Sequence, residues 1–556
     1  MLSALHLATL AAAPALQTAL PIVPDETYNA CEATIYENPD PHTLAECEFG
    51  VVPLVGQNPI CQRSDHFGAE FASGDWNGDG YLDLAIGGRH KPENKNLSAQ
   101  VWLYLGTSTG LSTAPTLTFD GNGESDQLGV SIAFLKAYST VGGQARDALA
   151  IGAPQYSSEN DPAPDEMSGR VYVFLGLEEG VDYSAGARFV AADEADIILE
   201  GGFCSGSWYG AAVAGGDIDG DGRGDLLVGE PGNPHTAATQ QCAGNAFAYL
   251  AASRLDLALT WGGGPWYGAW SDLFFLGAAS GDRFGRDVAC LGDLDGVGGE
   301  EFLIGAPQQE VDPAVGPVVN TGPGYARVYS YDPLATPANE GVLLAELNGI
   351  QVGEGFGNAV TGVPDLDLDG TDDLLVGAYR YTFAPGTALE EFEVGRAFAF
   401  SGADFSPLLQ GPDPRTGAPT TRLIGELAGG AFGWSVAGAD GMVGQPGGDL
   451  LIGAFQADAF ADDSSCGTGA TELIAGSAYV IDGGVGASPF VPLEVRGERF
   501  KDHVGFGVLA LDTDLDGDLD LVTGGMAWSC PSNCPIVGEA ETGRVYLVDV
   551  DGILTP

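Results

Sequence analysis

The sequence predicts an all-β protein, a seven-bladed β-propeller with four strands in each blade. An aromatic-Gly or Leu-Gly pair recurs from Phe67 to Phe506 at a mean spacing of about 73 residues. Short apolar runs, rich in β-branched and aromatic residues and bounded by Gly, Asp and Pro, follow each pair, as strands do. Glycine supplies 85 of the 556 residues, which disfavours helices. Repeats of this length with four strand signals each are typical of propeller blades.

Each repeat contains the same succession of strand signals. The pairs that open the repeats are Phe67-Gly68, Leu128-Gly129, Tyr209-Gly210, Phe284-Gly285, Phe356-Gly357, Phe432-Gly433 and Phe506-Gly507. A small-residue run follows the pair, and the second run has the form DLAIGG or DLLVGEP. A third run such as VWLYLG and a fourth such as DIILEGG complete the unit. We therefore expect one closed ring in place of several domains.

The two ends of the chain indicate how the ring closes. The run Val51–Val55 has the character of a fourth strand, whereas the last run, Val545–Val548, is a third strand. We expect the last blade to be closed by this N-terminal strand, which would remove an exposed sheet edge. The propeller would then occupy residues 51–556, after an N-terminal extension at 21–50.

The first 20 residues favour export. Met1–Leu20 is an uncharged Ala/Leu run with small residues at Ala13, Ala15 and Ala19, which suits a signal peptide at 1–20, although no Lys or Arg precedes the apolar part. A disordered or wrongly assigned start is the alternative. No later stretch is apolar enough to span a membrane, so we expect a secreted, extracellular or cell-surface protein.

Composition limits the partners and the compartment. The chain has 21 Lys+Arg against 77 Asp+Glu, a net charge of −56, which excludes a nucleic-acid partner. Its nine cysteines fit an oxidising compartment. Candidate disulfides join Cys530 to Cys534, Cys31 to Cys47 and Cys204 to Cys242, with Cys290 as a buried thiol.

The paired motifs resemble a known repeat. Phe-Gly pairs followed by Gly-Ala-Pro, as in Phe284-Gly285 and Gly305–Pro307, are similar to FG-GAP repeats, the units of the integrin α-subunit N-terminal propeller and of many bacterial surface proteins. The resemblance covers Val51–Pro556. It implies the propeller fold and calcium loops on the face opposite the ligand site. Without a stalk or membrane segment, the chain looks more like a bacterial secreted relative than an integrin subunit.

Four repeats carry a nine-residue loop, D-x-[DN]-x-D-G-x-x-D, between the first two strands. Positions one, three and five offer side-chain oxygens, position seven a backbone carbonyl and position nine a carboxylate, a set of hard oxygens that suits Ca²⁺. We expect about four calcium sites of structural role. The residues are Asp75, Asn77, Asp79, Tyr81 and Asp83; Asp217, Asp219, Asp221, Arg223 and Asp225; Asp365, Asp367, Asp369, Thr371 and Asp373; and Asp512, Asp514, Asp516, Asp518 and Asp520.

Several alternatives surround these loops. EF-hands need Glu at position twelve, where this chain has Ile86, Val228, Val376 and Thr523, so they are excluded. Asp and Gly are also ordinary turn residues. The fourth repeat has Asp293, Asp295 and Glu301 but Val297 at position five, which leaves a fifth site open. In the second and sixth repeats, Asp147, Asp440 and Asp449 are expected to close turns by hydrogen bonds. Arg223-Gly224-Asp225 spells the adhesion tripeptide, which we interpret as coincidence because Asp225 is an expected ligand.

Cations gather on the face opposite the acidic loops. The ligand-face candidates are Arg89, His90, Lys91, Lys95, Arg499 and Lys501. They favour an acidic glycan or a carboxylate-bearing extracellular protein as partner, and local neutralisation of an acidic fold is the alternative. Aromatic residues after the second strands could line the same face, namely Tyr156, Tyr379, Tyr381, Phe455 and Trp528.

No catalytic motif was found. The sequence lacks HExxH and P-loop patterns. We expect a calcium-stabilised, non-catalytic binding or adhesion module. The alternative is an extracellular polysaccharide-active enzyme, a lyase or glycosidase, built on the propeller.

Overall fold

The computed structural model describes residues 26–29, 34–37 and most of 67–548. The longest gaps in that range are 89–98, 156–167, 177–187, 233–242, 460–472, 483–492 and 526–543. The statements below concern the described residues.

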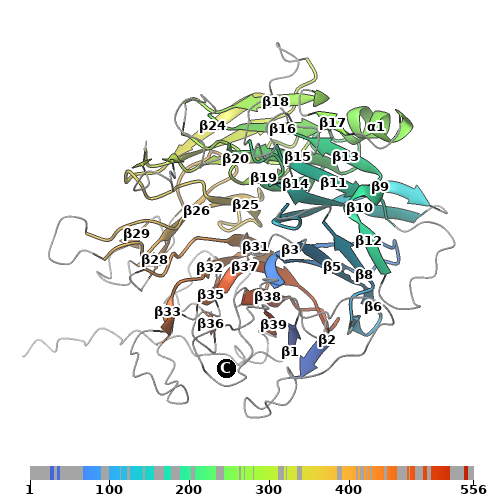
Figure 1. Cartoon of the computed structure of the whole chain (residues 1–556). Helices are drawn as coiled ribbons and strands as arrows, with labels where there is room; N and C mark the ends of the chain where they lie inside the picture. Colours follow the sequence, from blue (N-terminus) through green and yellow to red (C-terminus); the bar gives the residue numbers. More distant parts are fainter. Residues whose placement is uncertain are drawn as a thin grey trace, which may run out of the picture.

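Seven antiparallel sheets follow one another round a ring in sequence order (Figure 1). The first strand of each sheet contacts the first strands of the sheets before and after it. These contacts form an unbroken cycle, because the first strand of the seventh sheet also contacts that of the first. The protein is therefore a closed seven-bladed β-propeller with four-stranded blades, as the sequence predicted.

The first three blades are coloured blue to green in Figure 1. Blade one contains β3 (Phe67–Gly74), β4 (Asp83–Gly88), β5 (Gln100–Tyr104) and β8 (Leu117–Asp120). Blade two contains β9 (Ser131–Val141), β10 (Gln144–Ala153), β11 (Arg170–Phe174) and β13 (Ile197–Glu200). Blade three contains β14 (Ala212–Gly216), β15 (Asp225–Glu230), β16 (Asn245–Tyr249) and β18 (Leu273–Leu276).

The remaining blades continue in the same order. Blade four contains β19 (Val288–Gly292), β20 (Glu301–Ala306), β23 (Tyr325–Ser330) and β24 (Val342–Asn348). Blade five contains β25 (Ala359–Val363), β26 (Asp373–Ala378), β27 (Arg396–Phe400) and β30 (Leu423–Ile424). Blade six contains β31 (Val436–Asp440), β32 (Gly448–Ala454), β35 (Ser477–Asp482) and β36 (Leu493–Arg496). Blade seven contains β37 (Val504–Leu511), β38 (Asp520–Gly525) and β39 (Arg544–Val548).

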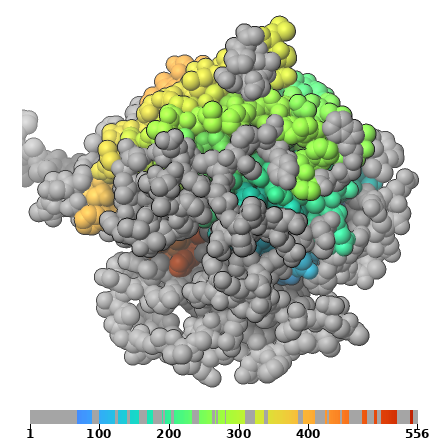
Figure 2. All heavy atoms as spheres, turned by 45° about the horizontal axis from the view of Figure 1, so that its top comes forward, coloured from blue at the N-terminus to red at the C-terminus, as the bar shows by residue number. Residues whose placement is uncertain are grey.

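Figure 2 turns the molecule so that blades three to five come forward. Several short strands and helical turns lie outside the four-stranded blades. Two strands add to the outer edges of preceding blades in parallel, β12 (Arg188–Ala191) on β8 and β17 (Trp266–Tyr267) on β13. Four small hairpins are β6 (Gly106–Thr107) with β7 (Gly110–Leu111), β21 (Gln309–Glu310) with β22 (Val319–Asn320), β28 (Gly411–Pro412) with β29 (Pro419–Thr420), and β33 (Asp458–Ala459) with β34 (Leu473–Ile474). The helical elements are a 3₁₀ turn (Ala192–Glu194), a π-helical turn (Ala251–Leu255) and α1 (Asp256–Trp261).

The core lies between neighbouring blades. Second strands such as β4, β15 and β26 are buried along their whole length, because both faces of each sheet are covered. One cluster joins Phe119 of blade one to Phe174 of blade two, with ring centroids 4.7 Å apart. Continuous apolar runs in the sequence are thus explained by sheets stacked face to face round the ring.

Glycines fix the spacing between blades. The second-strand glycine of each blade lies against the carbonyl oxygen of the paired glycine of the next blade. A Cβ at Gly453 would stand 2.0 Å from the oxygen of Gly505, so no larger residue fits there without movement. Gly524 of blade seven lies against Gly68 of blade one in the same way, so the contact also joins the last blade to the first.

These glycine contacts correct the repeat in blade seven. The pair that opens it is Val504-Gly505, whereas the sequence pointed to Phe506-Gly507. Val504 is fully buried, and Gly505 has the positive φ, 83°, of the other paired glycines. His503 also has the left-handed backbone found before the pairs of blades two to six. Phe506 is only partly buried, so the aromatic-Gly match lay two residues too late.

An N-terminal strand closes the last blade, but it is not the strand expected. β1 (Glu26–Asn29) pairs antiparallel with β39, and β2 (Thr34–Glu37) lies outside it. Val51–Val55 lies outside the described residues. The place beside β39 that we assigned to Val51–Val55 is therefore taken by β1.

Candidate metal centres and ligand face

The acidic loops gather their carboxylates at one end of the blades. Positions one, three and nine bring ligand-type oxygens within 4.8 Å of one another in blades three, four, five and seven. The groups are Asp217, Asp219 and Asp225; Asp293, Asp295 and Glu301; Asp365, Asp367 and Asp373; and Asp512, Asp514 and Asp520. In blade one the third position is the amide Asn77, between Asp75 and Asp83. Each loop joins a first strand to a second strand, as expected.

Backbone hydrogen bonds shape every loop in the same way. In blade five the Gly370 amide donates to Asp365 Oδ2 at 2.7 Å, and the Thr371 amide donates to Asp369 Oδ1 at 2.9 Å. The Leu366 amide donates to Asp373 Oδ2 at 2.7 Å, which ties position nine to the start of the loop. Equivalent bonds from position six to position one occur at Gly80, Gly222, Gly298 and Gly517. The loops thus hold their acids in a common arrangement.

The position-nine carboxylates are buried beneath the loops. Asp83, Asp225 and Asp373 have no exposed surface. Burial raises the pKa of Asp83 and Asp225 to about 8 and that of Asp373 to about 6, while backbone amides act in the opposite direction. Burial disfavours a negative charge unless a positive charge is near, so a bound cation would restore ionisation.

One buried oxygen tests whether a cation fits. Asp217 Oδ1 is buried and accepts no hydrogen bond from the described residues, while Oδ2 accepts one from the Gly222 amide at 2.8 Å. An unpaired buried carboxylate oxygen is costly unless a cation contacts it. With Asp219 and Asp225 beside it, the residues present fit a hard cation.

The fourth loop assembles as the others do. The sequence left it open because Val297 stands at position five. The structure brings together Asp293, Asp295 and Glu301, and the Val297 amide donates to Asp293 and Asp295 at 3.1 and 2.9 Å. The gathered carboxylates come from positions one, three and nine in each of these four clusters, so the side chain at position five does not decide the cluster.

Position four is a feature that the sequence analysis missed. Its backbone is left-handed in all five loops, with φ between 60° and 72°. Three loops place glycine there, but Leu368 and Leu515 occupy it in blades five and seven. Glycine adopts this conformation freely and leucine does not. The sequence did contain a signal for this conformation, because glycine recurs at position four in three of the loops, as Gly78, Gly220 and Gly296.

Blades two and six use single buried aspartates to close their turns. Asp147 accepts hydrogen bonds from the Ala137 amide and from the Asp75 amide of blade one, both at 2.7 Å. Asp449 accepts bonds from the Met442 and Val443 amides at 2.7 and 2.9 Å. These turns follow the hydrogen-bonded closure expected for them.

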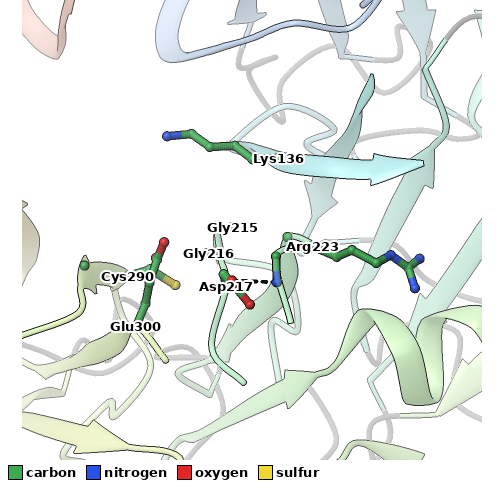
Figure 3. A pocket seen from close by; sticks show the side chains of 10 residues that line it. Lys136, Gly215, Gly216, Asp217, Arg223, Cys290 and Glu300 are labelled. Atoms are coloured by element: carbon green, nitrogen blue, oxygen red, sulfur yellow. Dashed lines mark hydrogen bonds between the residues drawn. The ribbon is translucent and has the colours of Figure 1, made fainter. Parts of the chain in front are cut away.

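A pocket of about 290 Å³ adjoins the blade-three cluster. Figure 3 shows Asp217 beside Cys290 and Glu300 of blade four, with Lys136 of blade two across the opening. The Glu300 amide donates to the Asp217 carbonyl at 2.8 Å. Cys290 is a half-buried free thiol, and burial raises its pKa well above the usual range. The candidate disulfide cysteines lie outside the described residues.

The adhesion tripeptide is not available for binding. The Arg223 guanidinium turns away from Asp217 in Figure 3 and donates two bonds to Asp256, at 2.8 and 2.9 Å. It also donates to the Tyr138 carbonyl, and Asp225 is buried. The structure thus supports the interpretation of Arg223-Gly224-Asp225 as coincidence.

The opposite face carries a cluster of aromatic rings contributed by blades five, six and seven. Trp434 lies 5.0 Å from Tyr379, 4.6 Å from Phe455 and 5.3 Å from Phe506, measured between ring centroids. Phe455 and His503 are 5.6 Å apart. Of the aromatic residues expected on this face, Tyr379 and Phe455 join the cluster, and Tyr381 lies over the Arg396 guanidinium at 4.0 Å.

The expected cations of this face cannot be placed. Arg89, His90, Lys91, Lys95, Arg499 and Lys501 lie outside the described residues, as do Tyr156 and Trp528. Their grouping stays a prediction.

Comparison with known proteins agrees with the architecture. The family described as FG-GAP repeat matches residues 209–245, the start of blade three with its acidic loop. Integrin alpha-4 of Xenopus laevis is 30% identical over 238 residues, which are 41% of this chain and 18% of that protein. Integrin alpha-IIb of Homo sapiens is 33% identical over 175 residues, 31% of this chain and 15% of that protein.

This chain is a seven-bladed propeller that contains an FG-GAP repeat at residues 209–245 and resembles the integrin α-subunits. The FG-GAP propeller also matches the phosphatidylinositol-glycan-specific phospholipase D of Bos taurus, with 26% identity over 367 residues, 61% of this chain and 38% of that protein. It spans less than half the length of each of these relatives. Within its described part, no helix is long and apolar enough to cross a membrane.

Proposed function

We propose that this FG-GAP propeller is an extracellular, non-catalytic binding or adhesion module for a protein or glycan, stabilised by calcium. The observation that carries the proposal is that the two faces of the propeller differ in their side chains. One face has five matching acidic loops, and the other has a partly exposed aromatic cluster around Trp434. The integrin-like relatives support a binding role. We also propose the leader at 1–20 that an exported protein needs.

The acidic loops favour calcium over other metals. Each offers at least two carboxylates and further oxygens in a flexible turn, and no described cysteine or histidine joins a cluster. Such sets suit Ca²⁺, whereas Zn²⁺ prefers nitrogen and sulfur. Asp217, Asp219 and Asp225 would hold the ion in blade three, with equivalent residues in blades one, four, five and seven. The ion would neutralise carboxylates that otherwise repel one another and so stabilise the turns.

A binding screen tests the proposed function. The full chain would be applied in calcium to glycan and extracellular-protein arrays, and a polysaccharide panel would be followed for both retention and product release. Retention without product supports the binding module, and product release would favour the alternative lyase or glycosidase. Loss of retention with Trp434→Ala, but not with Leu334→Ala, would place the ligand on the aromatic face, because Leu334 is 87% exposed in a loop on the acidic side.

Failure on every array, with the protein shown to be folded in calcium, would contradict the binding function. The calcium part has its own readout. A thermal transition that is the same in calcium and in chelator would contradict a stabilising ion.

A further inference from the structure

Equivalent residues follow the paired glycine of each blade. They are Ala69, Val130, Ala211, Arg286, Asn358, Trp434 and Phe506. Because they lie at or just before the start of the innermost strands, they are arranged round one end of the central channel. Neighbours among them touch: the Asn358 side-chain amide donates to the Trp434 carbonyl at 3.5 Å, and the Trp434 and Phe506 rings are 5.3 Å apart. We call this ring of positions the channel mouth.

Blade four places two arginines at the mouth. Arg286 is the channel-mouth residue, and Arg283 stands three residues before it with a left-handed φ of 57°. The Arg286 amide donates to the Arg283 carbonyl at 3.1 Å, so the backbone holds both in one turn. Both are half-buried.

Among the described residues, no carboxylate forms a salt bridge or hydrogen bond with either arginine, although the charge of Arg286 acts to lower the pKa of the nearby Asp287 and Glu70. Seven other arginines of the described chain form ion pairs with carboxylates, from Arg170 with Glu200 to Arg496 with Glu494. Arg283 Nε is buried and donates no hydrogen bond to a described residue. In a protein with 77 acids and 21 Lys and Arg, two adjacent unpaired guanidinium groups are unexpected.

The nearby carboxylates are engaged elsewhere. Asp282 accepts hydrogen bonds from the Tyr325 hydroxyl at 2.9 Å, the Gln308 side-chain amide at 3.0 Å and the Ala279 amide at 2.8 Å. Asp287 accepts one from the Val360 amide at 2.8 Å. The charge of Asp287 still acts on Arg286, but these acids direct their hydrogen bonds elsewhere, so the guanidinium donors of the mouth keep no hydrogen-bonding carboxylate among the described residues.

Glu70 of blade one faces the same region. Burial and the charge of Asp287 raise the pKa of Glu70 to about 8, and Arg286 acts against this rise. A carboxyl that is largely protonated at neutral pH cannot neutralise Arg286 there. Burial together with the charge of Arg286 lowers the pKa of Arg283 to about 10, as expected for two cations held close together.

Aromatic rings border the arginines. Tyr379 lies close enough to Arg283 to interact with it electrostatically, and it packs edge-on against Trp434. A ligand that reaches the guanidinium groups would therefore also meet these rings. Arginine suits planar carboxylates through paired hydrogen bonds, and aromatic faces suit flat apolar surfaces.

We propose that Arg283 and Arg286, with Trp434 and Tyr379, form a binding site for a uronate unit of an acidic glycan. This inference rests on the proposed binding function and names its ligand class. The sugar carboxylate accepts hydrogen bonds from the two arginines, and the C–H face of the sugar ring packs on the aromatic side chains. A uronate offers both parts within one residue, whereas an aspartate or glutamate side chain offers only the carboxylate.

Calorimetric titration of the full chain in calcium tests this site. The probes are a short galacturonate oligomer that does not gel with calcium, its methyl ester, a sulfated neutral oligomer and a glutamate peptide. Arg286→Gln and Arg283→Gln are each expected to weaken binding of the uronate oligomer about tenfold to a hundredfold, the cost of losing one charge-assisted hydrogen-bonding partner. Arg327→Gln, which removes a guanidinium paired with Glu346 in the same blade, is the matched control and should leave affinity unchanged.

The outcomes separate the possibilities. Unchanged affinity in both variants, equal binding of the methyl ester, or preference for the peptide or the sulfated oligomer would overturn the uronate site. If a variant fails to fold, protection of Arg283 and Arg286 from phenylglyoxal by the oligomer, read by mass spectrometry, replaces it, and absence of protection overturns the proposal. If the arrays reveal a ligand that the arginine variants do not affect, the binding function stands and this site fails.

Discussion

Replacing Asp367 by asparagine should change stability in opposite directions with and without calcium. Asp367 occupies position three of the blade-five loop and accepts the Asp369 amide at 3.2 Å. Blade one already has an amide there, and Asn77 Oδ1 accepts the Asp79 amide at 2.8 Å. Asparagine therefore fits the turn, and the substitution removes one negative charge while keeping the shape.

The magnitude follows from the spacing of the cluster. Two charges at the 4.8 Å limit of the group repel by about 0.9 kcal/mol in bulk water. Asp367 has two such neighbours, so in chelator the variant should be more stable by about 1–2 kcal/mol, less in salt. A divalent ion at about 2.4 Å attracts one carboxylate roughly twice as strongly as those neighbours repel it. In calcium the variant should therefore be less stable by a similar 1–2 kcal/mol.

Thermal and urea unfolding followed by circular dichroism, in excess calcium and in EGTA, measures both effects. Asp372→Asn is the matched control, because Asp372 is an exposed acid of the same loop outside the gathered group. It should shift stability in the same direction in both conditions. If Asp367→Asn also shifts stability in one direction only, the loop does not hold a cation through position three and the reasoning is wrong.

Three other substitutions probe the fold. Glu354→Ala should lower the free energy of unfolding by about 3–5 kcal/mol in urea titrations, because it leaves the fully buried Arg396 without its salt-bridge partner; a loss below about 1 kcal/mol would contradict this. Val504→Ala should cost about 2 kcal/mol and more than truncation of the partly buried Phe506, and the reverse order would restore the register suggested by sequence. Glu70→Gln should gain stability relative to the native chain as pH rises from 5 to 8, because burial raises the pKa of Glu70 from 4.5 to about 8 and ionisation then opposes folding; a pH-independent difference would refute this.

The sequence revealed most of the architecture because the pattern repeats. Each second-strand run is buried along its length, and each acidic loop lies where two strands meet, so seven copies reinforced one interpretation. The prediction was wrong where two neighbouring segments matched the pattern equally well. The segment His503–Gly507 contains two glycines that could open the blade, and the burial of Val504 decides between them.

Other features depend on contacts that no local pattern encodes. β1 and Val51–Val55 are both plausible edge strands, and only pairing with β39 selects β1. The channel mouth combines residues of separate blades, such as Arg286 and Trp434, and although they occupy equivalent positions of their repeats, the repeat does not say which of their side chains meet. The acidic loops were predictable because each is continuous, and the mouth was not because it is assembled by the ring.

Closure by β1 has a consequence for biogenesis. Glu26 pairs with Leu547, so a strand synthesised before blade one must wait for a strand synthesised after the rest of blade seven. Six blades can form in order during synthesis, but blade seven stays incomplete, with an unsatisfied strand edge, until β39 arrives. Pairing across such a separation is slow because the loop-closure entropy is lost before contacts compensate it. The ring can therefore lock only after β39 has been synthesised and has met β1.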